Sequence, residues 1–179
     1  MIGGAVMAWK NDLKKSMDVF VTLIKPVLES VMKGAYISVE GSLDEIAQIL
    51  DKRIGIDAMI DKGSTVYGLA SRIQIDSGVW NTFTIRCKRE TGHITELEKL
   101  RKAIANDSMR PQITMQAYVE NGKLKSIGLA RTADIIHYID THECTERKSS
   151  DGRWARFKYV KWEDMLKEGY KIKVIDYRQ

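Results

Sequence analysis

Three consecutive segments with the two-residue period of β-strands lie between two segments of helical period, and this order limits how the chain can fold. The first, RIGIDAMI at 53–60, alternates Ile and Ala with Arg53, Gly55, Asp57 and Met59. Two further strand-like segments follow at 64–75 and 80–89, and the turns before each of them contain Asp and Gly. Such turns are typical of hairpins, so the pattern predicts three strands in quick succession, joined by two hairpins.

Helical segments lie on both sides of these strands. In the first, at 7–32, apolar residues recur every three or four positions, and Pro26 inside it predicts a kink or two consecutive helices. Two shorter helices are predicted at 42–51 and 95–107, because Ser42–Glu45 and Thr95–Glu98 each have the spacing of a capping box.

The remainder of the chain alternates strands and helices. After Pro111 we expect strands at 112–120 and 123–131, a helix at 132–141, a strand at 153–160, a short helix at 162–168 and a final strand. The sequence therefore predicts one α/β (α+β) domain over 1–179 with a mixed central sheet. It consists of an N-terminal helical arm (1–34), a core (42–131) and a C-terminal extension (132–179).

The charge balance is mildly basic. Lys and Arg number 29 against 24 Asp and Glu, which gives a formal charge of +5 in 179 residues. This favours polyanions slightly but does not by itself indicate nucleic acid. Two cysteines are too few for a disulfide framework, so we expect a reducing, cytoplasmic location, and neither a signal peptide nor a membrane span is expected.

The order of elements from 42 to 131 resembles the αβββαβ core of the PD-(D/E)XK nuclease-like superfamily. The motifs GID at 55–57, SRIQ at 71–74 and NTFTIR at 81–86 look like those of small phage and prophage proteins of that type. The resemblance implies a DNA phosphodiesterase that uses Mg²⁺ or Mn²⁺, acting in the host cytoplasm if it is phage-encoded. Hard divalent ions of this kind need oxygen ligands beside the scissile phosphate.

The resemblance also implies a set of site residues. By position, Asp57, Gln74 and Glu45 would hold the metal, and Arg72 would contact phosphate, so these four are the catalytic candidates. The sequence departs from the superfamily pattern, since no acid occupies the expected place on the third strand and no Lys follows at spacing two. Catalytic activity is therefore an open question, and the chain could also have kept the fold and lost the metal.

Each candidate also has a structural explanation. Asp57 could lie on a solvated face beside Arg53, and Glu45 could serve only in the capping box. Arg72 and Gln74 alternate onto one face of a strand expected to be buried, where long polar side chains need partners. Arg72 and Gln74 could equally lie at the solvent-exposed end of an edge strand.

A basic stretch follows on the next predicted strand. Thr82, Thr84, Arg86 and Lys88 would share one face by alternation, and Arg89 follows, so Arg86, Lys88 and Arg89 are candidate contacts to nucleic acid. The alternative is the solvated outer face of a sheet.

Three classes of function agree with these patterns. The first is a metal-dependent DNA nuclease, and the second is a non-enzymatic module that binds nucleic acid or protein on the same scaffold. The third is an inhibitor of a host enzyme. The apolar stripe of the N-terminal arm could pack on its own sheet or mediate a dimer, so the oligomeric state is left open.

Overall fold

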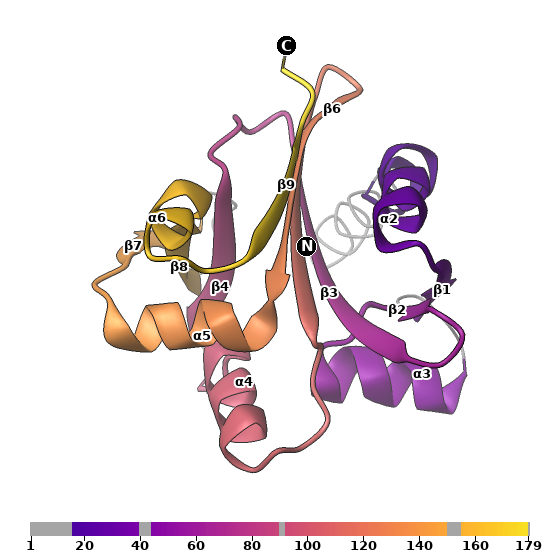
Figure 1. Cartoon of the computed structure of the whole chain (residues 1–179). Coiled ribbons are helices and arrows are strands. Elements are labelled where there is room, and N and C mark those ends of the chain that lie inside the picture. The colour runs from indigo at the N-terminus through magenta and orange to yellow at the C-terminus, as the bar shows by residue number, and fades with distance from the viewer. Residues whose placement is uncertain (1–15, 40–43, 90–91, 150–154, 179) are drawn as a thin grey trace, which may run out of the picture.

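The computed structural model describes residues 16–39, 44–89, 92–149 and 155–178, and the chain has the mixed α+β fold that the sequence predicts. A six-stranded sheet has the order β1-β2-β3-β5-β6-β9, and a three-stranded sheet has the order β4-β8-β7 (Figure 1). The strands are β1 (Ala35–Ser38), β2 (Ala58–Asp61), β3 (Val66–Ile75), β4 (Thr82–Arg89), β5 (Ile113–Glu120), β6 (Lys123–Arg131), β7 (Thr145–Lys148), β8 (Ala155–Lys161) and β9 (Ile172–Asp176). The helical elements are η1 (Phe20–Ile24), α2 (Lys25–Met32), α3 (Glu45–Ile49), η2 (Leu50–Ile54), α4 (Glu96–Ala105), α5 (Thr132–Thr141) and α6 (Trp162–Lys167).

Two of the predicted hairpins are confirmed in the six-stranded sheet. β2 pairs antiparallel with β3, and β5 pairs antiparallel with β6. The turn between β5 and β6 contains Asn121 and Gly122, both with positive φ, at 52° and 69°. That conformation suits the right-handed twist of the two strands it joins, and Asn and Gly adopt it at low cost.

The predicted hairpin between 64–75 and 80–89 is wrong. β3 instead pairs in parallel with β5, and β4 joins the three-stranded sheet. The end of β3 is tied to its parallel neighbour, because the Asp76 amide donates to the Val119 carbonyl and the Asp76 carboxylate accepts from the Asn121 amide. The chain then crosses to the second sheet, so the strands of the predicted αβββαβ core keep their order in sequence but do not form one sheet.

The predicted strand at 53–60 is shorter than expected. The preceding helix continues as the π-helical turn η2 to Ile54, and Gly55 ends it with a φ of 81°. Only Ala58–Asp61 is strand, paired on its other side with β1, which the sequence patterns did not predict. The short edge strand β7 was also missed. Both are four residues long, too short for alternation to be recognised.

The helix after β1 begins differently from the prediction. Asp44 is its N-cap, and the Asp44 carboxylate accepts a hydrogen bond from the Ala47 amide at 3.0 Å. Glu45 is the first helical residue, so the capping-box prediction for Glu45 is wrong, while its expected partner Ser42 lies outside the described residues. The second predicted capping box is confirmed, with both reciprocal bonds between Thr95 and Glu98 present.

The six-stranded sheet is covered on both faces. On one face the described part of the N-terminal arm buries Phe20, Ile24 and Leu28 against β2, β3, β5 and β6, and residues 1–15 of the predicted arm lie outside the described residues. Pro26 lies in the first turn of α2, directly after η1, as the two-helix prediction requires. The other face packs against the three-stranded sheet and α6, which Figure 1 shows on the opposite side from α2. No helix in the described part of the chain has the length and apolar character needed to cross a membrane.

Side-chain hydrogen bonds join the two sheets. The Thr82 amide donates to the Tyr118 hydroxyl at 3.0 Å, and that hydroxyl donates to the Thr82 carbonyl, also at 3.0 Å. Next to this pair, the Thr84 hydroxyl donates to the Gln116 side-chain oxygen. All four residues are buried, so this face of β4 is not the solvated outer face considered in the sequence analysis.

Candidate functional site

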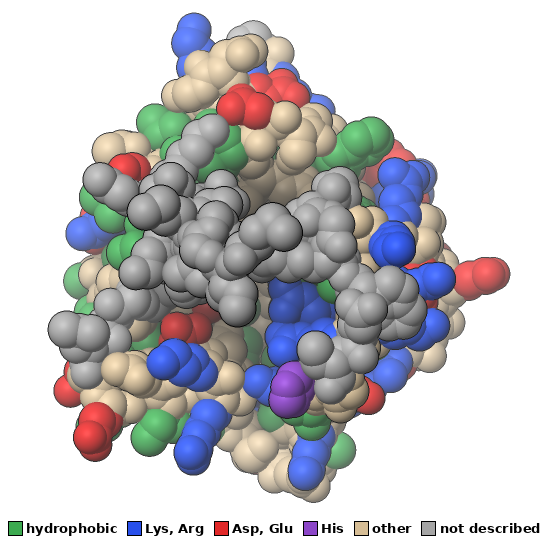
Figure 2. All heavy atoms as spheres, turned by 180° about the vertical axis from the view of Figure 1, so that it is seen from behind, with side chains coloured by type: hydrophobic (Ala, Val, Ile, Leu, Met, Phe, Trp, Pro, Cys, Tyr) green, Lys and Arg blue, Asp and Glu red, His purple; other side chains and the backbone are tan. Residues whose placement is uncertain are grey.

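A pocket of about 550 Å³ lies where η2, β3, β4 and α4 meet. Its charged lining residues are Asp51, Lys52, Asp57, Arg72, Arg86, Arg89, Glu96 and Lys99. Five cationic side chains thus surround the cavity against three carboxylates, which gives it an excess of positive charge. Figure 2 shows Lys and Arg side chains gathered near the middle of one face of the molecule.

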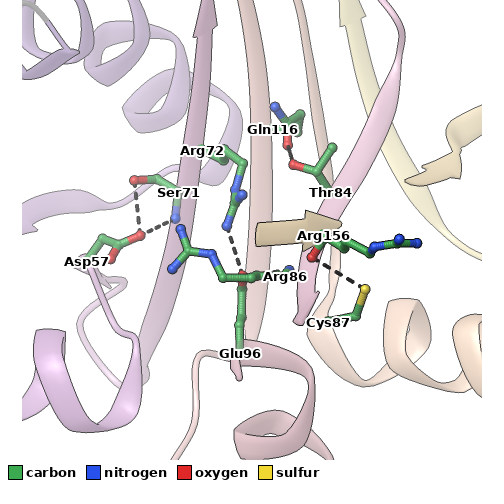
Figure 3. A network of polar contacts seen from close by, with 9 residues as sticks. All are labelled: Asp57, Ser71, Arg72, Thr84, Arg86, Cys87, Glu96, Gln116 and Arg156. Atoms are coloured by element: carbon green, nitrogen blue, oxygen red, sulfur yellow. Dashed lines mark hydrogen bonds and ion pairs between the residues drawn. The ribbon is translucent and has the colours of Figure 1, made fainter. Parts of the chain in front are cut away.

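Glu96 organises the cationic side of the pocket from the first turn of α4. The Glu96 carboxylate oxygen Oε2 accepts hydrogen bonds from Arg72 Nη2 at 2.8 Å and from the Arg86 backbone amide at 3.1 Å. In Figure 3 the Arg72 guanidinium points toward Glu96, and the Arg86 side chain extends toward Asp57. Since the Thr95–Glu98 capping box fixes the start of α4, it also fixes the position of Glu96.

An aromatic ring lies beneath the two arginines. The guanidinium carbons of Arg72 and Arg86 lie 5.0 and 5.3 Å from the centroid of the Phe157 ring on β8. Both distances fall within the range of a cation–π interaction. The ring and Glu96 together hold Arg72 in place, which leaves it less available to a ligand than a free side chain would be.

Asp57 lies in the same pocket as Arg72, directly before β2. Its Oδ2 accepts hydrogen bonds from the Ser71 amide at 2.5 Å and from the Ser71 hydroxyl at 3.3 Å (Figure 3). Asp57 and Arg72, two of the site residues expected from the sequence, thus line the same pocket. The alternative explanation, in which Asp57 lies on a solvated strand face beside Arg53, does not hold, because residue 53 belongs to η2.

A β-bulge decides which of the three predicted nucleic-acid contacts face the pocket. The pairing of β4 with β8 shifts between Arg86 and Lys88, so strict alternation fails there. As a result Arg86 and Arg89 line the pocket, whereas Lys88 is 55% exposed and pairs with Glu146. The prediction that Lys88 shares a face with Thr82, Thr84 and Arg86 is wrong for this reason.

The three predicted metal ligands do not come together. Glu45 is exposed on the first turn of α3, and neither Glu45 nor Gln74 belongs to the pocket lining that contains Asp57. The ligands of one hard cation must all lie within about 2.6 Å of it, so this donor set does not fit a Mg²⁺ or Mn²⁺ ion. Among the residues that the structure describes, no group of three or more His, Cys, Asp or Glu side chains is arranged to hold a metal ion.

Gln74 has a different environment. Its side-chain Oε1 is buried and has no hydrogen-bond partner within the described ranges, and the same is true of Gln116 Nε2 on the neighbouring strand. The expectation that polar groups on this face of β3 find partners thus holds for Arg72 and fails for Gln74.

Several pocket residues were not singled out from the sequence. Burial raises the pKa of the Asp51 carboxyl, and the neighbouring Lys52 partly opposes this effect. Lys99 is anchored by a hydrogen bond from its Nζ to the Lys52 carbonyl at 3.1 Å. The capping-box motif could have pointed to Glu96 as a helix-start acid, whereas Asp51 and Lys52 lay at a predicted helix end and gave no signal.

The pocket has the composition of an anion-binding site, rich in guanidinium and ammonium groups. Neither a protein-family model, nor a curated protein, nor a solved structure matches this chain. The pocket itself therefore carries the functional argument.

Proposed function

We propose that this chain binds nucleic acid and that the pocket between η2, β3, β4 and α4 holds backbone phosphate. The observation that carries the proposal is the lining of five cationic side chains against three carboxylates. Phosphate contacts from Lys and Arg supply most of the sequence-independent affinity of nucleic-acid-binding proteins. The cavity volume of about 550 Å³ is within the usual range for a ligand pocket.

Arg89 is the best candidate for a direct phosphate contact. Its Nε is buried in the protein with no hydrogen-bond partner among the described residues, whereas Arg72 pairs with Glu96. Since that Nε is shielded from solvent, a phosphate would be bound through the terminal N–H groups of the planar guanidinium. In this proposal Arg72 orders the pocket wall rather than carrying the ligand.

The test is a salt titration of binding with two neighbouring variants. Fluorescence anisotropy with a labelled oligonucleotide should show affinity that falls steeply with salt, and Arg89→Ala should reduce both the affinity and the magnitude of the salt slope, the latter by about one. Lys88→Ala is the matched control. It removes the same charge one residue away, but the Lys88 side chain points out of the pocket. Equal effects of both variants, or binding that does not respond to salt, would contradict the proposal.

Phosphodiester cleavage at Asp57, which shares the pocket with Arg72, is a second candidate function, and a divalent ion there would need ligands other than the predicted set of Asp57, Glu45 and Gln74. The same oligonucleotides are incubated with Mg²⁺ or Mn²⁺, using the wild type and Asp57→Ala. Cleavage that needs both the ion and Asp57 would establish the enzyme. Binding without cleavage would support the non-enzymatic nucleic-acid-binding module instead.

A further inference from the structure

One face of the three-stranded sheet carries arginine and aromatic side chains in a continuous row beside the pocket. In the pairing of β4 with β8, Arg86 lies opposite Phe157, and in the pairing of β8 with β7, Arg147 lies opposite Phe157 and Thr145 opposite Tyr159. Directly paired residues share a face, so these side chains all project to the same side. Toward the start of β4 the same face, with Thr82 and Thr84, packs against the six-stranded sheet, and on the opposite face Phe83, Ile85 and Val160 are buried in the core.

Two groups of cation–π contacts lie along this row, one at the pocket and one farther out. The Phe157 ring lies under both Arg72 and Arg86. Farther out, the Arg147 guanidinium lies 5.8 Å from the Trp80 ring centroid and 5.7 Å from that of Tyr159. Arginine side chains and aromatic rings therefore lie next to one another across this face of the sheet.

Trp80 is the most exposed aromatic side chain of this row and is held in a fixed orientation. Its indole is 56% exposed, yet its Nε1–H donates to the Ser77 carbonyl at 2.9 Å. The ring also lies against the backbone at Gly78, where an added Cβ would come within 3.2 Å of the indole nitrogen. An exposed ring that is already ordered loses little entropy when a flat ligand stacks on it.

We infer that the ligand is single-stranded nucleic acid, in which an unpaired base stacks on the exposed Trp80 ring while the backbone runs into the cationic pocket. This inference rests on the proposed function and adds the class of nucleic acid. Bases in a duplex are already stacked on one another, so an aromatic platform gives an advantage only to a strand whose bases are free. Phosphate contacts contribute to the binding of single strands and duplexes alike, since the pocket contacts only the backbone.

The experiment compares three ligands of equal length under one salt condition: a thymidine 20-mer, a strand of the same length containing abasic sites, and a 20-base-pair duplex. The wild type should bind the thymidine strand about tenfold more tightly than either of the others, because stacking of even one or two bases gives about that factor. A uridine 20-mer should bind similarly to the thymidine strand, since stacking needs no 2′-hydroxyl.

Variants then separate the aromatic row from the pocket. Trp80→Ala should weaken binding of the thymidine strand about tenfold and leave the abasic strand and the duplex nearly unchanged, while Trp80→Phe should keep most of the preference. Arg89→Ala should weaken all ligands alike. Tyr177→Ala, which truncates a 49% exposed aromatic residue beyond β9, is the control for loss of an exposed ring.

The outcomes distinguish the two proposals. Equal loss for all ligands in Trp80→Ala, or a wild type that prefers the duplex, would overturn the single-strand inference while leaving phosphate binding intact. If no ligand binds in a salt-dependent way, the proposed function fails together with the inference. Circular dichroism of each variant verifies that the fold is retained.

Discussion

Arg72 Nη2 lies 2.8 Å from Glu96 Oε2, and the two side chains are 29% and 27% exposed. The pair joins β3 of the six-stranded sheet to the first turn of α4. Because Glu96 also accepts a hydrogen bond from the Arg86 amide, one carboxylate fixes three separate elements around the pocket. Removing its charge should therefore affect stability more than removing a typical surface charge does.

Glu96→Gln should lower the free energy of unfolding by about 1–2 kcal/mol, since Arg72 loses its ionic partner while half-buried. Urea denaturation monitored by circular dichroism measures the change. The control is Asp107→Asn, which removes a carboxylate that is 96% exposed and lies 3.4 Å from Arg110, and its effect should stay within about 0.5 kcal/mol. Equal effects of the two variants would contradict the role given to Glu96.

Tyr118→Phe should destabilise the contact between the sheets. The variant leaves the buried Thr82 amide and carbonyl without their partner, which costs about 1–3 kcal/mol in total. The pKa of Tyr118 is raised by burial, so the hydroxyl stays protonated and able to donate well above neutral pH. Denaturation of Tyr118→Phe beside Tyr177→Phe, where the ring is exposed, checks this, and similar losses would contradict the role given to the Tyr118 hydroxyl.

The capping box of α4 should give a stability term that depends on pH. Hydrogen bonds from the Thr95 amide and hydroxyl hold the pKa of Glu98 below its usual value. A lowered folded-state pKa stabilises the protein above the unfolded pKa, and this contribution is lost as pH falls through the folded one. The stability difference between wild type and Glu98→Gln should thus shrink below about pH 4, the ordinary range for Glu.

Thr95→Ala tests the same box from the other side. It should cost about 1 kcal/mol at pH 7, since the N-cap oxygen that accepts from the Glu98 amide is removed. Thermal unfolding at pH 7 and pH 3 measures both variants. A Glu98→Gln difference that does not vary with pH would contradict the assignment.

Asp51 should make nucleic-acid binding tighten as the solution is acidified. Burial raises the pKa of this pocket carboxyl, so on acidification it becomes neutral before an ordinary Asp does, and the pocket gains positive charge. Asp51→Asn should bind more tightly than wild type at pH 7 and should show a smaller gain as the pH is lowered. Anisotropy titrations at constant salt measure the gain, and an identical pH profile for both proteins would refute the effect.

Gly128→Ala should be strongly destabilising, because a Cβ at this position would lie 2.4 Å from the indole of the buried Trp162. Overpacking of this kind costs about 1–3 kcal/mol. Combining it with Trp162→Phe should recover part of the loss, since the smaller ring leaves room, and this makes the two changes non-additive. Additive losses in a double-mutant cycle would mean that the two positions do not compete for space.

Local sequence patterns predicted much of the fold. Helix α5 has the predicted bounds, the Thr95–Glu98 capping box starts α4, and the Asn121–Gly122 turn joins β5 to β6. Each depends on a few neighbouring residues whose conformational preference is strong. The turn residues at 76–78 also predicted a hairpin, and that prediction was wrong. Hydrogen bonds of Asp76 to Val119 and Asn121 hold the end of β3 beside β5, and the chain then crosses to the second sheet.

The site was predictable in part. Asp57 and Arg72 were linked by a resemblance in element order, and they do share a pocket, but Glu45 and Gln74 do not join them. Other contacts in the pocket join residues that are far apart in sequence. Arg72 and Glu96 are 24 residues apart, and Lys52 and Lys99 are 47 residues apart. Such contacts arise from the packing of β4 and α4 over the sheet, and no local periodicity encodes that arrangement.

The bulge in β4 has a practical consequence for protein engineering. Because of it, two residues rather than one or three separate Arg86 and Arg89, the cations of β4 that face the cavity. Deleting Cys87 would restore regular alternation and leave Arg86, Lys88 and Arg89 opposite Phe157, Arg156 and Ala155. The bulge could therefore be removed from the strand without changing which charged residues face the cavity.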